Sequence, residues 1–467
     1  MSKILLIRPK SKNDTYPLPH VGLAMLSSVL KEKGHQVKVL DYLLFINSKE
    51  PDLKDTIQNF NPDVIGISIY TSTLNVCNRM MDEIYNLTDK PILVGGPHPS
   101  IYTDELVKNK KISYIFKGES ELTINEIINN AKKQDEPVVV ETLMPDVTKL
   151  PLPDFTSFIN YTSVTVYPLL TSRGCPFGCS FCVVKYVSSQ KWRMRDYKVC
   201  VDELEQAKKL FPNLRLIKVS DDCPTFDLSR FKSFLKEYIN RKIDIAMTID
   251  NTRADRIDEE FVQLAKKANN TNLCVGAEHG DAEVFDFIGK SETLETIKNA
   301  ARTIKKNGLE LRLCFIIGLP KDNLKRIEKS IGLAKELGAF HIYWNMVHPM
   351  KGTKIRKWFE ENNAIFYDDS DYTSYRFNTL EPLDPVVETP DFSFEERKKA
   401  YFRAVVETDQ YPLNLKEIWY LVKYSVKYKY LLISVKSFFR QILKYIPKKY
   451  KSVIRRISTL IKKSSSS

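Results

Sequence analysis

Short apolar runs alternate with helical patterns along most of this chain, and this alternation strongly restricts the folds open to it. In the first 135 or so residues, β-branched runs predict strands at 4–9, 36–41, 64–69, 92–95 and 112–116. Helical periodicity lies between them, at 20–33, 74–86 and 122–132. Strands that alternate with helices form a parallel sheet, so we expect an α/β fold that opens with a doubly wound, Rossmann-like domain.

A second series of strands follows, and each strand again precedes a helical pattern. Six are predicted, at 164–171, 214–220, 243–249, 272–277, 311–317 and 342–347. Between the two series, Pro145, Pro151 and Pro153 indicate an extended linker. We therefore divide the chain into a Rossmann-like domain (1–138), a Pro-rich linker (139–163), a βα-repeat domain (164–375) and a helical extension (376–467).

Three of the eight cysteines lie within eight residues, directly after the first strand of the second series. Cys175, Cys179 and Cys182 have the spacing C-x3-C-x2-C, and three thiolates on so short a loop fit an iron–sulfur cluster with one iron left open. A structural zinc site needs four ligands, and the nearest spare donors, Lys185 and Cys200, give no zinc-like spacing. The alternative is three incidental core cysteines.

This spacing, with an aromatic residue just before Cys182, resembles the signature of the radical S-adenosylmethionine (SAM) enzymes. The resemblance implies that Cys175, Cys179 and Cys182 bind a 4Fe-4S cluster whose open iron chelates SAM. Electron transfer then cleaves SAM and produces a 5'-deoxyadenosyl radical. It also implies that the six βα units form a partial (βα)6 TIM-like barrel, with the chemistry at the carboxyl ends of its strands.

Further residues match positions that contact SAM in that family, and the resemblance assigns them to its binding site. They are Asp221 and Asp222 after the second strand, Glu278 after the fourth, Gly318 after the fifth, and Arg195. Four of these five residues have a plainer alternative. The two aspartates can cap the next helix, Arg195 can form a surface ion pair, and Gly318 can serve only as a turn residue.

The order of loop motifs in the first 120 residues is similar to the cobalamin-binding domain that precedes the barrel in one large radical SAM subfamily. The resemblance assigns cobalamin contacts to Gly22, Thr73, Gly95, Gly96, His98, Gly118 and Glu119. No histidine here stands in the D-x-H-x-x-G motif, so we expect cobalamin without a protein histidine on cobalt. His98 is the remaining candidate ligand, although we favour a loop-packing role for it. An α/β domain without this ligand is the alternative.

The excess positive charge of the chain lies in its last part. Residues 411–467 hold 14 Lys and Arg and one acid, which accounts for the whole net charge of +13. Apolar residues recur there at helical spacing, first at Leu432, Val435, Phe439, Ile442 and Ile446, and after Pro447 at Tyr450, Val453, Ile457 and Leu460. We expect two basic amphipathic helices that contact an anionic membrane or instead cap the barrel. Nucleic acid is disfavoured as a partner, because no basic-aromatic binding module is present.

The first residues read as a strand rather than a secretory signal, and free thiolates indicate a reducing compartment. We expect a cytoplasmic protein with peripheral contact to the inner face of the membrane. The resemblance implies a cobalamin-dependent radical SAM enzyme, and we favour a methyltransferase that acts on an unactivated carbon of a small-molecule or lipid substrate, with an external electron donor. The alternatives are a cyclase or rearrangement enzyme with the same cofactors, and a membrane-associated, non-catalytic iron–sulfur protein.

Overall fold

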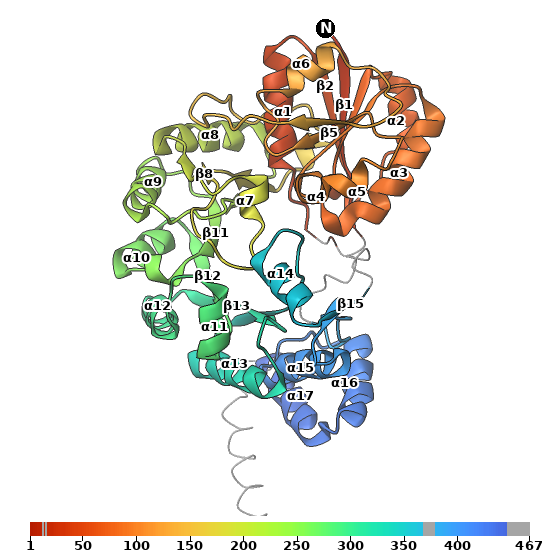
Figure 1. The fold of residues 1–467 in the computed structure, drawn as a ribbon. Coiled ribbons are helices and arrows are strands. Elements are labelled where there is room, and N and C mark those ends of the chain that lie inside the picture. Colours follow the sequence, from red (N-terminus) through yellow and green to blue (C-terminus); the bar gives the residue numbers. More distant parts are fainter. Residues whose placement is uncertain (12–13, 15, 368–378, 446–467) are drawn as a thin grey trace, which may run out of the picture.

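The computed structural model describes residues 1–11, 14, 16–367 and 379–445. Two parallel sheets follow each other along the chain, and a group of helices completes the carboxyl-terminal part (Figure 1). The first sheet domain lies at one end of the molecule in Figure 1, and α15 to α17 lie at the other end. The α/β fold class predicted from the sequence is confirmed.

The first sheet has six parallel strands in the order β2-β1-β3-β4-β5-β6. Its central strands β1, β3 and β4 are largely buried and apolar because helices cover both faces. The order reverses direction between β1 and β3, which is a topological switch point. The strands are β1 (Lys3–Arg8), β2 (Gln36–Asp41), β3 (Val64–Ser68), β4 (Ile92–Gly95), β5 (Tyr114–Lys117) and β6 (Val138–Glu141). The helices are α1 (Val21–Glu32), α2 (Leu53–Phe60), α3 (Leu74–Leu87), α4 (Pro97–Ile101), α5 (Thr103–Leu106) and α6 (Ile124–Asn129).

Part of the segment predicted as a linker belongs to this domain. Strand β6 pairs with β5 and extends to Glu141. Further on, the chain runs along the outer edge of β2, where Val39 N donates to Ser157 O at 2.8 Å and Ile159 N donates to Val39 O at 2.9 Å. This contact covers the exposed edge of the sheet, which protects it from pairing with other chains.

The second sheet also has six parallel strands, but its order, β14-β13-β12-β11-β10-β7, follows the chain without reversal. All six predicted strands are confirmed. The two edge strands, β7 and β14, do not pair with each other, so the sheet is an open, partial barrel. The strands are β7 (Val166–Leu169), β10 (Leu216–Val219), β11 (Ala246–Thr252), β12 (Asn270–Glu278), β13 (Glu310–Ile317) and β14 (His341–Met346). The helices are α8 (Tyr197–Leu210), α9 (Leu228–Asn240), α10 (Glu259–Lys267), α11 (Ala282–Ile288), α12 (Leu294–Lys306) and α13 (Leu324–Leu337).

The carboxyl-terminal part packs on the end of this sheet, where α15 contacts β13, β14 and α13. Its elements are α14 (Lys354–Glu361), β15 (Ile365–Phe366), β16 (Val387–Glu388), α15 (Phe394–Glu407), α16 (Leu415–Lys427) and α17 (Leu431–Tyr445). The first amphipathic helix of the tail corresponds to α17, and the second, predicted from Tyr450 onward, lies outside the described residues. Among the described residues, no helix has the length and apolar character needed to span a bilayer.

Candidate functional site

The three cysteines lie on one loop whose two ends are fastened together. Strands β8 (Ser172–Arg173) and β9 (Arg193–Met194) form a short antiparallel ladder that closes the loop. Gly174 opens the loop with a φ of +83°, and a Cβ at this position would lie 2.5 Å from Lys191 O. Only glycine tolerates both that dihedral and that approach. We call residues 174–192, which include α7 (Val184–Val187), the cysteine loop.

The cysteine loop is also held from outside by neighbouring strand ends. Gly174 N donates to Asp222 Oδ2 at 2.9 Å, beyond the end of β10. Ser180 N donates to Ile288 O at 2.8 Å, at the end of α11. The guanidinium of Arg253 lies over the Phe177 ring, 3.5 Å from its centroid. The loop conformation is thus fixed by contacts that require the folded barrel.

The thiols of the loop are free and only partly buried. Burial raises the pKa of Cys179 to about 11 and also raises the pKa of Cys182, whereas a hydrogen bond with Cys223 lowers the pKa of Cys175 to about 7. A cation that binds Cys179 or Cys182 would therefore displace a proton, because the thiolate is the form that binds a metal.

The arrangement of donors also indicates the kind of metal centre. In the described part of the chain, no three His, Cys, Asp or Glu side chains converge on a point that could hold a single ion. A mononuclear site needs such convergence, with sulfur about 2.3 Å from the metal. In an iron–sulfur cluster each cysteine binds its own iron, so the thiols can be spread out. The C-x3-C-x2-C spacing of Cys175, Cys179 and Cys182 is of this second kind.

A buried network of charges lies beside the loop. Lys290 Nζ is 3.1 Å from Glu278 Oε1 and 3.0 Å from Glu292 Oε2, and it also donates to Gly276 O. Arg253 continues the network, 3.8 Å from Glu292. Glu278 is buried and has a φ of +57°, which is costly for a residue with a side chain. The end of β12 thus holds one carboxylate in a strained, fixed position.

Two residues predicted to contact SAM are already engaged with other parts of the protein. The carboxylate of Asp221 is fully buried and accepts from Thr171 N at 2.7 Å and from the hydroxyls of Thr171 and Ser172 at 2.6 Å each. Arg195 donates to Glu203 at 2.6 Å and to Leu170 O at 2.8 Å. The geometry therefore gives both residues a supporting position behind the β8 ladder.

Gly318 is likewise held on both sides by the protein. It has a φ of +87°, its N–H donates to Asp322 Oδ2 at 2.7 Å, and its carbonyl accepts from Arg397 Nη1 at 2.8 Å. Arg397 is fully buried and comes from α15, outside the βα repeats. The turn after β13 is thus shaped by the carboxyl-terminal helices.

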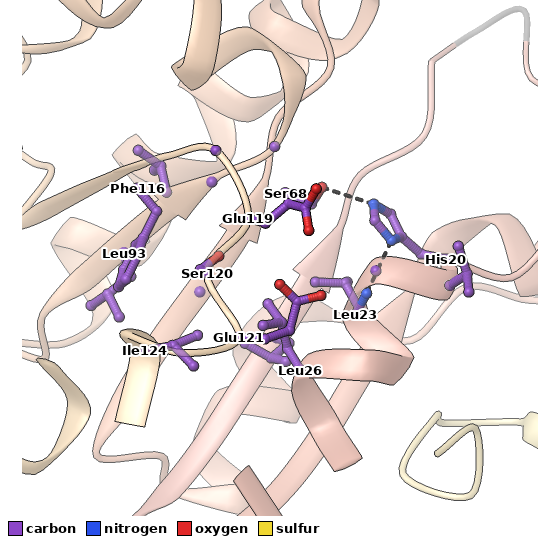
Figure 2. A pocket seen from close by; sticks show the side chains of 18 of the residues that line it. His20, Leu23, Leu26, Ser68, Leu93, Phe116, Glu119, Ser120, Glu121 and Ile124 are labelled. Atoms are coloured by element: carbon purple, nitrogen blue, oxygen red, sulfur yellow. Dashed lines mark hydrogen bonds between the residues drawn. The ribbon is translucent and has the colours of Figure 1, made fainter. Parts of the chain in front are cut away.

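A cavity of about 260 Å³ extends from the core of the first domain to the cysteine loop. Figure 2 shows the part of its lining that comes from the first domain. Its depth is apolar and lies over the switch point of the first sheet, between α1 and α6. The predicted residues that line it are Gly22, Gly95, Gly96, Gly118, Glu119 and Asp222. The second domain also contributes Leu170, Arg173, Val187, Ser188 and Ser220. The apolar depth is formed by Ile4, Leu6, Val64, Leu93, Ile124 and Ile128, among others.

His20 lines this cavity and was not predicted as a site residue. Its Nδ1 accepts from Leu23 N at 3.1 Å and caps α1, so the proton is on Nε2, which lies 2.9 Å from Ser68 Oγ (Figure 2). Burial lowers the pKa of His20 to about 3, so the ring is neutral. Sequence reasoning missed it because histidine is not a typical N-cap residue.

The other two predicted residues of the first domain do not line the cavity. His98 is fully buried and stacks on Tyr102, with 4.8 Å between the ring centroids, and burial lowers its pKa to about 4. Thr73 belongs to a 3-10 turn, where its hydroxyl accepts from Tyr70 N at 3.2 Å. Both side chains pack the loops that surround the cavity.

Buried ion pairs join the two domains at the mouth of the cavity. Arg173 lies 2.6 Å from Glu121 and 3.0 Å from Glu119, and Arg193 also pairs with Glu119. The two arginines are the end residues of the β8 ladder, while the glutamates follow β5. The sequence showed these acids but not their partners, which are more than 50 residues away.

Two family models match the chain in the order of its domains. Residues 10–128 match the B12 binding domain, and residues 169–334 match the Radical SAM superfamily. The second match begins at the end of β7 and includes the cysteine loop. The first covers the part of the chain that forms most of the cavity.

Individual relatives agree with these matches. The chain is 26% identical to an uncharacterized methyltransferase of Pyrococcus horikoshii over 86% of this chain and 92% of that protein. It is 24% identical to the anaerobic magnesium-protoporphyrin IX monomethyl ester cyclase of Rubrivivax gelatinosus, over 77% and 69%. Among solved structures, the fold is similar to that of the radical SAM methyltransferase TsrM of Kitasatospora setae with cobalamin and a 4Fe-4S cluster bound (TM-score 0.68, 16% identity, 88% and 91% covered).

Proposed function

Because the chain belongs to the radical SAM superfamily and carries a B12-binding domain ahead of its barrel, we propose that it is a cobalamin-dependent methyltransferase acting on an unactivated carbon. The observation that carries this proposal is the single cavity lined by both domains. It gives a corrinoid bound in the first domain a direct opening toward the cysteine loop. Methyl transfer between cofactors and substrate requires such proximity.

The cysteine loop is the proposed cluster site. Cys175, Cys179 and Cys182 would each bind one iron, and the cluster supplies the electron that cleaves SAM. Beside it, Asp222 and Glu278 lie at two strand ends. Each has a partner within the protein through one oxygen, Asp222 Oδ2 with Gly174 N and Glu278 Oε1 with Lys290, and the other oxygen of each carboxylate would accept from the amino and ribose groups of SAM. Asp221, Arg195 and Gly318 act as positioning residues, because their polar groups already bind within the protein.

The first domain is the proposed cobalamin site. An apolar protein cavity of about 150 Å³ is large enough for benzene, so one of 260 Å³ suits the larger aromatic base of a corrinoid. Gly96 and Gly118 have positive φ and let the backbone approach the ligand. Both ring nitrogens of His20 are engaged and His98 lies outside the cavity, which supports cobalt without a protein histidine. The bound corrinoid supplies the methyl group.

A ring-forming reaction is the second candidate, because the cyclase of Rubrivivax gelatinosus is among the relatives. It would use the same residues for both cofactors, so the two reactions differ in their product.

For either reaction we propose a hydrophobic substrate, an external electron donor and a location at the cytoplasmic face of the membrane. The basic, apolar surface of the last helices supports this location.

The test is anaerobic reconstitution of the full chain with iron, sulfide and cobalamin, followed by incubation with reductant, methyl-labelled SAM and a cell lipid extract. A methyltransferase produces 5'-deoxyadenosine and a product that carries the labelled methyl group. A cyclase produces 5'-deoxyadenosine and a product that has lost hydrogen without gaining label. Absence of 5'-deoxyadenosine from the parent, or equal amounts from Cys179→Ala, would overturn the proposed enzyme and favour a non-catalytic iron–sulfur protein.

A further inference from the structure

Helix α16 exposes a row of large apolar side chains. Leu415, Trp419, Val422 and Val426 follow one another at spacings of four, three and four, which puts them on one face of the helix. Trp419 is 56% exposed and Val426 is 67% exposed. A helix that packs on a globular core normally turns such a row inward. Here the buried face holds Tyr420, Leu421 and Ser425, so the outer row faces away from the core, and the Trp419 ring contacts its helix neighbours Tyr420 and Lys423.

Helix α17 is packed with a largely polar face inward. Its fully described buried residues are Ser434, Ser437 and Gln441. Ser434 shares a hydrogen bond with Ser425 at 2.6 Å, Ser437 donates to Asp409 at 2.7 Å, and Gln441 donates to Tyr411 O at 2.8 Å. Of the apolar row predicted for the tail, Leu432, Val435 and Phe439 are exposed. These three positions therefore do not close the barrel, because hydrogen bonds orient the helix the other way, whereas Ile442 is partly buried and the later positions of the prediction lie outside the described residues.

The charge around these two rows is positive. Glu417 is the one acid from residue 411 onward, and its buried carboxylate accepts from Leu380 N and from Thr379 Oγ1. Lys423, Lys429 and Lys436 are exposed and form no ion pair with any described residue. Other basic residues pair with acids of neighbouring segments, such as Arg440 with Asp409 at 2.8 Å. Neither helix thus presents an acid of its own to solvent.

We infer that the exposed face of α16 and α17 binds the surface of an anionic phospholipid bilayer. We call it the basic apolar surface, defined by Leu415, Trp419, Val422, Lys423, Val426, Lys429, Leu432, Val435, Lys436 and Phe439. Apolar rows flanked by lysines, with a tryptophan among them, suit the boundary between headgroups and acyl chains. This inference specifies which surface contacts the membrane named under the proposed function. It rests on the proposed function only for the hydrophobic nature of the substrate.

Charge favours a bilayer over a second copy of the chain as the occupant. Two copies that met through this surface would bring lysines of the same sign together, whereas anionic headgroups neutralise them. The chain also continues beyond α17 for 22 residues, 446–467, with seven Lys and Arg and no acid. This segment carries charge of the same sign as the basic apolar surface.

The surface is remote from the cavity. Figure 1 places α16 and α17 at the end of the molecule opposite the first domain, whereas the cavity lies between the first domain and the barrel. Contact with a bilayer therefore leaves the cavity and cysteine loop uncovered. The role assigned to this surface is to concentrate the enzyme at the membrane, and SAM cleavage itself should not depend on it.

Flotation of the reconstituted full chain with vesicles tests this inference. The vesicles contain either phosphatidylcholine alone or phosphatidylcholine with 30% phosphatidylglycerol. We expect binding to the anionic vesicles, a loss of about tenfold in partition coefficient for each of Trp419→Ser and Phe439→Ser, and a loss of about fivefold for Lys423→Gln. Leu143→Ser removes an apolar residue that is 65% exposed on the linker, and it should float like the parent.

Each outcome decides for or against the inference. Equal flotation of the parent, Trp419→Ser and Phe439→Ser would refute it, as would equal binding to neutral and anionic vesicles. A dimer in light scattering that dissociates in these two variants, without vesicle binding by the parent, would assign the surface to a second copy instead. SAM cleavage is measured in parallel. Its failure in a parent that floats would overturn the proposed enzyme but leave the basic apolar surface standing.

Discussion

The two sheets have the same number of parallel strands, yet they create binding sites of different kinds. In the first sheet the strand order reverses between β1 and β3, and an apolar cavity opens over that reversal. Gly66 on β3 contributes to its depth, since a Cβ there would lie 2.8 Å from Leu6 Cδ2. The second sheet has no reversal. Its thiols lie on the loop after β8, and its charged groups lie at the end of β12 and after α11, around Cys179, Glu278 and Lys290.

The difference shows how the order of the strands determines the kind of binding site that a sheet can support. Helices that diverge at a switch point leave internal space, which suits a large ligand with an apolar part. Strands in unbroken order bring successive loops side by side, which suits a small polar constellation. The ion pairs from Arg173 and Arg193 to Glu119 hold the two kinds of site against each other. Each site should therefore fail separately when its own residues are changed.

The largest effect is expected at the cysteine loop. Cys182→Ala removes one of three cluster ligands, so SAM cleavage should fall to background and the iron content of the reconstituted protein should drop. Cobalamin binding should persist, because the first domain is untouched. Iron analysis, 5'-deoxyadenosine formation and the cobalamin absorbance measure these effects. Cys77→Ala, which changes a buried thiol of α3, is the matched control and should retain SAM cleavage.

Filling the cavity of the first domain should instead weaken cobalamin binding and leave SAM cleavage intact. Ser120 lines the cavity, and Ser120→Trp would place an indole within it (Figure 2). We expect cobalamin affinity to fall at least about tenfold, or about 1.4 kcal/mol, while SAM cleavage continues. Leu122→Trp is the control, since Leu122 is exposed and does not line the cavity. Equal affinities for the two variants would mean that cobalamin binds elsewhere.

A smaller effect is expected where the two sites are joined. Glu119→Gln weakens the pairs with both Arg173 and Arg193 and leaves two largely buried guanidinium groups short of charge compensation. Stability should fall by about 1–3 kcal/mol, seen as a lower midpoint of thermal unfolding. Glu126→Gln on the exposed side of α6 should leave the midpoint unchanged. An unchanged midpoint for Glu119→Gln would show that the domains do not depend on these pairs.

The sequence predicted the features that are local and could not predict those that depend on distant partners. Strands were found where apolar runs are strong, but β6, with three of its four residues exposed, and α2, with two buried residues, were missed. The cysteines were predicted from their spacing and the glycines of the cavity from the order of motifs in the first 120 residues, and both signals are carried by short stretches of the chain. His20 with Ser68, and Arg173 with Glu119, join residues 48 and 54 positions apart, and no local pattern signals such pairs.

The carboxyl-terminal tail shows that a helix can be predicted from the sequence although its buried face cannot. Its apolar spacing correctly predicted a helix, but which face of α17 is buried follows from the hydrogen bonds of Ser434, Ser437 and Gln441. Arg195 and Asp221 were likewise identified as polar groups near the site. Their engagement with Glu203 and with the Thr171 backbone could be seen only in the folded chain.

A pH-dependent effect is expected from the carboxyl group buried beneath the second sheet's loops. Burial raises the pKa of Asp221 to about 6 from an ordinary value of 3.8. The folded protein therefore holds this proton more tightly than the unfolded chain does, and stability is lost as the pH rises through about 6. The shift corresponds to at most about 3 kcal/mol. In cluster-free protein, the stability advantage of the parent over Asp221→Asn should shrink between pH 4 and 7.

Asp154, beside the first sheet, should show the opposite sign. Although burial opposes it, hydrogen bonds from Ser157 and Thr156 and the nearby Lys31 lower the pKa of Asp154 to about 2. Its contribution is present above pH 3.8 and is lost as the pH falls toward 2. Urea unfolding of the parent, Asp221→Asn and Asp154→Asn across this range measures both. If the advantage over Asp221→Asn grew with pH, Asp221 would be held as a carboxylate by its three donors, and the contrast between the polar second site and the apolar first site would be sharper still.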